Sequence, residues 1–183
     1  MKVYHVNRFF GIFILILFSF SCSSDLDFNQ VNDLRTEPVF IANLSYFDIP
    51  AKDFVDNGVE QNVSFDAQDF DVFRDTFFRD NLKRADFYFE ITNTISRAYA
   101  FDLNFLDQND QALYTIHFDV PASNGAPVII KKTEVFENAS LDLLKTAKRM
   151  EFVLVMAPGP VLSESSVGSF KLRSSATVYL AVE

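Results

Sequence analysis

Two short segments of the chain carry oxygen donors at spacings that suit a calcium ion. The donors are Asp66, Asp69 and Asp71 in the first segment, and Asp107, Asn109 and Asp110 in the second. Calcium takes six to eight oxygen ligands, which carboxylate and amide side chains supply. Neither segment has the regularly spaced acidic loop that makes a calcium motif specific. Each is therefore interpreted as a solvated turn, with a calcium site as the alternative.

Catalysis by a serine or cysteine nucleophile needs a base, and histidine is the usual one. The chain has two histidines, His5 near its start and His117, which alternation places on the outer face of a strand. A zinc site draws on several His or Cys ligands, so His117 alone does not make one. No catalytic residue and no enzymatic activity are predicted. A small hydrolase that uses two carboxylates remains an alternative, because acidic residues are abundant.

The chain begins with the features of a cleaved export signal. Lys2 and Arg8 precede an apolar run, Phe9–Phe18, and small residues lead from there to Cys22, the single cysteine. A charged start, a short apolar core and small residues before the cut are typical of a secretory signal. The run is shorter than the roughly 20 residues of a membrane-spanning helix. Met1–Ser21 is therefore predicted to be removed.

The segment Ser19-Phe20-Ser21-Cys22 resembles the lipobox of bacterial lipoproteins, in the looser form of Bacteroidota. That resemblance implies that Cys22 becomes the N-terminus and carries three acyl chains, palmitate among them. Two or more acyl chains give stable membrane attachment, whereas one gives marginal binding. The resemblance thus implies a lipid-anchored protein of the outer membrane.

The residues directly after the cysteine suggest which face of that membrane is occupied. They are Ser23, Ser24, Asp25 and Asp27, with Leu26 between the two acids. This segment resembles the acidic export signal of Bacteroidota lipoproteins that reach the cell surface. Surface exposure is the expectation, and a periplasm-facing position is the alternative.

Composition narrows the classes of partner. The chain has 16 basic and 25 acidic residues, and two of the basic ones lie in the signal, so the remainder carries a formal charge of −11. A negative body repels phosphate backbones, which disfavours a nucleic-acid partner. With Cys22 used for the anchor, no disulfide is available. Five of the 22 phenylalanines lie in the signal, and the other 17 are spread along the rest of the chain, which indicates one continuous core. The absence of Trp disfavours, without excluding, a glycan-binding platform.

Hydrophobic alternation predicts a mainly β fold. The expected strands are Val39–Phe47, Asp86–Thr92, a hairpin over 100–120 with a turn at 107–110, Val128–Phe136, Phe152–Met156 and Ser175–Val182. The uniformly apolar Phe152–Met156 is expected to be buried on both faces. Loops are expected at Pro121–Pro127 and from Pro158 to Ser169.

Two helices are expected among these strands. The first starts at a cap on Asn138 or Ser140 and extends to Arg149, with basic residues at its end and Leu141 and Leu144 on its packed face. The second is a short helix around Phe73–Leu82, where phenylalanines recur at near-helical spacing.

These elements predict a Greek-key or immunoglobulin-like β-sandwich with one crossover helix near 138–149. The domain is expected to span 38–183, after a lipidated cysteine and polar tether over 22–37. Its Phe-rich strands also look like those of many small flavobacterial lipoproteins, a likeness that implies no function.

The expected function is a non-catalytic, lipid-anchored binding or structural module at the outer membrane, with an envelope protein or a surface glycan as partner. A calcium-stabilised glycan- or ligand-binding module is the first alternative, and the carboxylate hydrolase is the second. The sequence does not indicate an oligomeric state.

Overall fold

Alternating apolar residues build the strands of this protein. In β5 (Leu82–Asn93), Phe87, Phe89 and Ile91 are buried while the residues between them are exposed or half-buried. A strand with this period must lie with one face on the core. The computed structural model describes residues 36–61, 63–70 and 75–182, without the side chains of 63–68.

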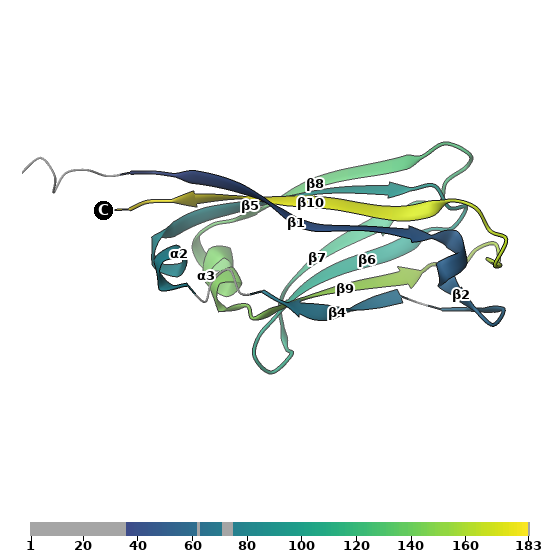
Figure 1. The fold of residues 1–183 in the computed structure, drawn as a ribbon, viewed down its shortest axis with the longest axis horizontal. Helices are drawn as coiled ribbons and strands as arrows, with labels where there is room; N and C mark the ends of the chain where they lie inside the picture. Colours follow the sequence, from purple (N-terminus) through teal and green to yellow (C-terminus); the bar gives the residue numbers. More distant parts are fainter. Residues whose placement is uncertain (1–35, 62, 71–74, 183) are drawn as a thin grey trace, which may run out of the picture. The chain divides into compact units, whose positions relative to one another are not determined.

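The strands pair into two antiparallel four-stranded sheets. Sheet one has the order β1 (Val39–Pro50), β10 (Ser169–Leu180), β5 and β8 (Val128–Phe136). Sheet two has the order β4 (Val63–Asp69), β9 (Arg149–Met156), β6 (Tyr99–Leu106) and β7 (Ala112–Val120). Figure 1 shows the two sheets as the layers of a sandwich. The predicted Greek-key β-sandwich is confirmed, and its eight strands follow the jelly-roll order.

Phenylalanines from both sheets form the core between the layers. Phe47 of β1 contacts Phe101 of β6, with ring centroids 6.0 Å apart, and Phe89 of β5 contacts Phe118 of β7 at 5.5 Å. Such edge-to-face and tilted ring pairs add to the free energy gained by burying the rings. Truncating a fully buried ring such as that of Phe101 to alanine is expected to cost about 3–5 kcal/mol.

Two strand predictions need correction. β9 is not buried on both faces: its residues alternate, and Val155 is 39% exposed. The outer face of sheet two is open to solvent at β9, and some of the apolar residues of this strand lie on that face. β10 starts at Ser169 rather than Ser175, because Phe170 and Leu172 point into the core and alternate with the outward-facing Lys171 and Arg173.

The crossover helix is confirmed as α3 (Asn138–Thr146), which links β8 to β9 and buries Leu141 and Leu144. Its predicted cap and end are wrong. The N-cap is Glu137, whose backbone N–H donates to the Ser140 hydroxyl at 3.1 Å. Ser140 therefore lies inside the first turn and reaches back, as in a capping box. The helix stops at Thr146, so Arg149 belongs to β9.

The short helix expected around Phe73–Leu82 is present as α2 (Thr76–Asn81). The carboxylate of Asp75 accepts a hydrogen bond from the Phe77 N–H at 2.8 Å and caps the helix. Of the predicted span, residues 73 and 74 lie outside the described residues.

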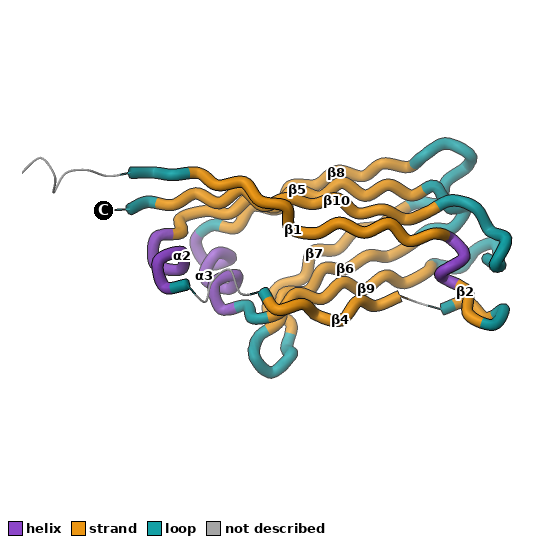
Figure 2. Tube along the Cα trace, in the orientation of Figure 1, coloured by secondary structure: helices purple, strands orange, loops and turns teal. Residues whose placement is uncertain are grey.

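The sandwich has two different ends (Figure 2). The helix end carries α2, α3, the start of β1 and the end of β10, and Thr36 forms a bridge with Val182 there. The loop end carries the 3₁₀ turn η2 (Ala51–Phe54), the hairpin of β2 (Val55–Asp56) and β3 (Val59–Glu60), and the loops 94–98, 121–127 and 157–168. Residues 36–182 form one compact unit.

Candidate functional site

The loop end is held together by an ion pair between a buried arginine, Arg97, and a half-buried acid, Glu60. Arg97 is 7% exposed, and its two terminal nitrogens each lie 3.2 Å from a carboxylate oxygen of Glu60. Its Nε donates to the Ala157 carbonyl at 2.5 Å, and Nη1 also donates to the Pro160 carbonyl. The Leu162 N–H donates to the same carboxylate at 2.7 Å. One side chain thus connects the β2–β3 hairpin, the loop 94–98 and the loop 157–168.

Further buried bonds fix the neighbouring loops. Asn93 is fully buried; it donates to the carbonyls of Arg97 and Pro121 at 2.8 Å each and accepts from the Ile95 N–H. Gly168 lies so close to the Thr94 carbonyl that a Cβ there would be 2.5 Å from the oxygen. Because these polar groups are satisfied inside the protein, the loops have a defined conformation rather than many.

Three valines project from these loops. Val59, Val161 and Val167 are between 59% and 85% exposed, so more than half of each residue's surface faces solvent. Val59 precedes Glu60 and Val161 precedes Leu162, the two residues joined by the hydrogen bond above. We call these three residues the loop-end valines. Rigidly held loops that expose apolar side chains are suited to protein binding.

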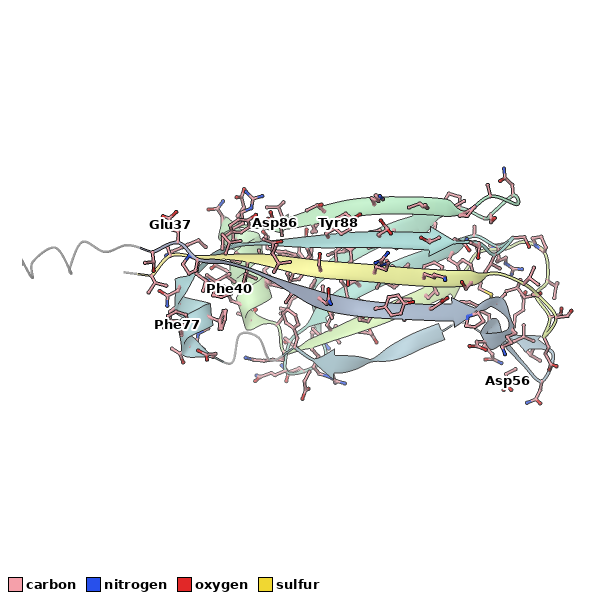
Figure 3. All side chains as sticks on the ribbon, turned by 45° about the horizontal axis from the view of Figure 1, so that its top comes forward. Glu37, Phe40, Asp56, Phe77, Asp86 and Tyr88 are labelled. Atoms are coloured by element: carbon pink, nitrogen blue, oxygen red, sulfur yellow. The ribbon has the colours of Figure 1, made fainter. Side chains whose placement is uncertain are left out.

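A second surface feature is a hollow of about 800 Å³ beside the β-bulge of β1. At the bulge, the Ser174 hydroxyl accepts from the Ser45 N–H and donates to the Ser45 carbonyl, at 2.9 Å each. The lining residues are Asn43, Leu44, Ser45, Tyr46, Lys171, Arg173 and Ser174. A smaller hollow of about 300 Å³ adjoins it and adds Tyr88 and Glu90. Figure 3 shows Tyr88 on the outer face of sheet one.

Some of the predicted calcium ligands have other partners in the part of the chain that the structure describes. Asp107 accepts from the backbone N–H groups of Gln111 and Asn109, which lowers the pKa of its carboxyl. Asp110 pairs with Arg149. Asp69 is exposed at the end of β4; Asp71 and the side chain of Asp66 lie outside the description. In the described part of the chain, no three His, Cys, Asp or Glu side chains group as a metal site.

His117 lies on the outer face of sheet two, as predicted, and is half exposed. Its Nδ1 is 2.5 Å from Asp102 on the neighbouring strand, and its Nε2 is 3.3 Å from Asp119. The hydrogen bond with Asp102, and then that with Asp119, raises the pKa of the imidazole. The two acids thus favour the protonated form of this surface histidine.

The carboxylate hydrolase hypothesis needs an acid whose pKa is raised. Among the described residues, the carboxyl groups with a resolved change all shift downward. Lys171 lowers the pKa of Asp48, Lys131 that of Glu90, and backbone N–H groups that of Asp107. This arrangement gives the hydrolase hypothesis no support.

The anchor residues Cys22, Ser23, Ser24, Asp25 and Asp27 lie outside the described residues. Across residues 36–182, where described, no helix has the length and apolar character needed to cross a bilayer.

Arg97 and Glu60 were not singled out by the sequence. They are 37 residues apart, and Arg97 stands in a polar stretch, Asn93–Arg97, which resembles an ordinary loop. The sequence offers one weak indication of a role for Arg97: it is the single charged residue in the stretch Asn93–Arg97. The hollow beside β1 was also missed, because a bulge depends on pairing with β10.

No family model matches the chain, and no curated protein matches its sequence. Among solved structures, the infectious bursal disease virus VP2 subviral particle is similar at 10% identity and a TM-score of 0.44, over 79% of this chain and 32% of that one. A putative secreted protein of Parabacteroides distasonis is similar at 14% identity and a TM-score of 0.36, over 78% and 38%. The chain spans about a third of the solved chains it first matches. Likenesses at these TM-scores carry no functional argument.

Proposed function

We propose that this protein is a non-catalytic, lipid-anchored module of the bacterial outer membrane that binds an envelope protein with its loop end. The proposal rests on two features: the lipobox-like sequence around Cys22, and the end of the sandwich at which the chain enters the domain. β1 starts at the helix end, where Val39 pairs with Tyr179, and finishes at the loop end, where Pro50 pairs with Ser169. The chain from the anchor therefore joins the domain at the end opposite the loops.

That placement is the observation that carries the proposal. Thr36 and Val182 exchange backbone hydrogen bonds of 3.0 and 2.9 Å, which fixes the point of entry. The 13 residues from Ser23 to Arg35 can span at most about 45 Å. A module attached in this way has its loop end free to meet a partner, and the loop-end valines supply apolar contact area there.

The first experiment tests the anchor. Cells expressing the full-length chain are labelled with a palmitate analogue, in parallel with the Cys22→Ser variant. We expect label on the wild-type chain and none on the variant. A wild-type chain without label would overturn the anchor.

The second experiment tests the binding surface. Membranes carrying the tagged, full-length chain are crosslinked mildly, and partners are recovered with it. We expect a partner to be lost with the double variant Val161→Ser/Val167→Ser and retained with Val155→Ser, an exposed valine on sheet two. Equal recovery with all three chains would contradict binding at the loop end.

The hollow beside the β1 bulge supports a second candidate, a small-ligand or glycan site. Tyr46 is 66% exposed at this hollow, Tyr88 lies at the adjoining one, and Arg173 and Asn43 line both. Aromatic faces beside hydrogen-bonding groups suit a sugar ring. Nuclear magnetic resonance titration with purified surface polysaccharide should shift the signals of residues 43–46.

A calcium chelator is expected to leave the melting temperature unchanged.

A further inference from the structure

The helix end exposes an apolar patch that the fold itself does not use. The patch consists of Val39, Phe40, Ile41 and Phe77, which are between 48% and 76% exposed. Phe40 lies on the face of β1 that contacts α2, whereas Val39 and Ile41 point to the other face of the same strand, so the apolar residues surround the start of β1. Ring contacts join its two elements: the Phe78 ring lies 6.2 Å from that of Phe40 and 5.9 Å from that of Phe77. Figure 3 shows Phe40 and Phe77 at the same end as Glu37. We call these four residues the helix-end patch.

Basic side chains lie at the same end. Arg79 of α2 lines a hollow of about 420 Å³ together with Lys145 and Lys148. In the part of the chain that the structure describes, neither lysine forms an ion pair, nor does Lys83 at the start of β5. These cations stand out in a chain with a formal charge of −9.

Many of the acids at this end have partners of their own. Asp86 binds Arg84 at 2.6 Å, Asp80 lies 3.6 Å from Arg79, and Asp110 pairs with Arg149. Asp107 is occupied by backbone N–H groups. The lysines therefore remain available to an external anion.

We propose that the helix end docks on the lipid surface, with the helix-end patch in the boundary between headgroups and acyl chains and the lysines against lipid phosphates. The proposal rests on the lipid anchor proposed above. Its independent support is that the patch starts at Val39, three residues after the chain enters the domain at Thr36. Aromatic and aliphatic side chains flanked by Lys and Arg are the combination that membrane interfaces favour.

Docking adds something that the anchor alone does not provide. A lipid anchor holds a domain at the membrane but does not by itself set the orientation of the domain. Contact at the helix end restricts that orientation and directs the loop-end valines away from the bilayer. The loop end would then be presented to a partner in one orientation.

The chain contains no Trp, so a single introduced Trp is an unambiguous fluorescent reporter. Full-length, lipidated protein carrying Phe40→Trp or Phe77→Trp is placed in vesicles of phosphatidylethanolamine and phosphatidylglycerol with brominated acyl chains. Val161→Trp at the loop end is the matched control. We expect bromine to quench the two helix-end reporters at least twofold and to leave the control unchanged.

The outcomes separate docking from anchoring, because vesicle flotation measures the anchor in the same samples. Protein that floats with helix-end reporters no more quenched than the control overturns the docking alone. Protein that does not float overturns the anchor, and with it the docking. Reporter emission that changes with protein concentration rather than with bromine would show that a second copy covers the patch, which also overturns the proposal.

A charge reversal tests the role of the lysines. The double variant Lys145→Glu/Lys148→Glu should lose about half of the quenching of the Phe77→Trp reporter on vesicles rich in phosphatidylglycerol. Lys131→Glu, on the outer face of sheet one, is the control and should change nothing. Equal quenching in both variants would contradict the contact between these lysines and lipid phosphate.

Discussion

The two ends of the sandwich use charged and apolar residues in opposite ways. At the loop end the charges of Arg97 and Glu60 are turned inward and bonded, while valines point outward. At the helix end Lys145 and Lys148 are unpaired among the described residues, and they accompany exposed aromatic rings. Buried polar groups with all their hydrogen bonds formed hold a surface in one conformation. Exposed Lys and aromatic side chains can change rotamer, which suits contact with a lipid surface. This difference is the basis of our two proposals, a defined protein partner at the loop end and a lipid surface at the helix end.

The largest difference between the ends should appear when a cation is removed from each. Replacing Arg97 with leucine removes the guanidinium from Glu60 and from two carbonyls, although the Leu162 N–H still donates to Glu60. Because Glu60 is 24% exposed, we expect a loss of about 3 kcal/mol, the lower end of the range for a broken buried ion pair. Lys148→Ala removes an exposed cation and should cost less than about 0.5 kcal/mol. Urea denaturation of both full-length variants measures the free energies of unfolding. Similar losses at the two ends would contradict the comparison.

A matched pair of glycines tests how tightly the loop end is packed. Gly168 and Gly125 have similar positive φ angles, 101° and 105°, but only Gly168 lies against another segment. Gly125→Ala should cost about 1 kcal/mol from the backbone conformation alone. Gly168→Ala also drives a Cβ against the Thr94 carbonyl and should cost at least about 2 kcal/mol. Thermal denaturation that ranks them equally would show that this contact relaxes freely.

One polar atom at the loop end is not satisfied. The Tyr99 hydroxyl is buried without a hydrogen-bond partner, and this burial raises its pKa. An unpaired buried hydroxyl costs about 1–3 kcal/mol, so Tyr99→Phe should stabilise the protein by about 1 kcal/mol. The melting temperature of this variant should rise. A fall would mean that the hydroxyl has a partner that the fold depends on.

The smallest effect concerns His117 and can be followed by proton magnetic resonance. Its raised pKa should fall toward 6.5 in Asp102→Asn, because the first of its two acidic partners is then neutral. Since the folded protein favours the protonated ring, this stabilisation is present below about pH 6.5 and is lost as the pH rises through the folded-state pKa. An unchanged titration curve in the variant would show that Asp102 does not interact with the ring in solution.

The sequence was sufficient for elements whose pattern is local. The hairpin over 100–120 alternates apolar and polar residues, so the period alone predicted it. The strand Val128–Phe136 was predicted at the bounds that the structure shows. The start of α3 was misplaced, because the capping box depends on Ser140 reaching back to Glu137. The start of β10 was missed although Phe170 and Leu172 alternate with Lys171 and Arg173, a period that indicates a strand.

The candidate sites were harder to predict than the fold. Acidic residues in turns suggested calcium, but Asp107 uses its oxygens to close its own turn. The pairing of Arg97 with Glu60 depends on two loops that meet only in the folded sandwich. The helix-end patch was missed for the same reason: Phe40 and Phe77 are far apart in sequence and become neighbours through the ring of Phe78.

The most direct test of the account is amide hydrogen exchange of the lipidated, full-length protein on vesicles, compared with the Cys22→Ser chain in solution. The account predicts slower exchange on vesicles in residues 39–43 and 76–81, and no change in the loop 157–168. Slower exchange in the loop 157–168, or no difference anywhere, would contradict the assignment of the helix end to the membrane.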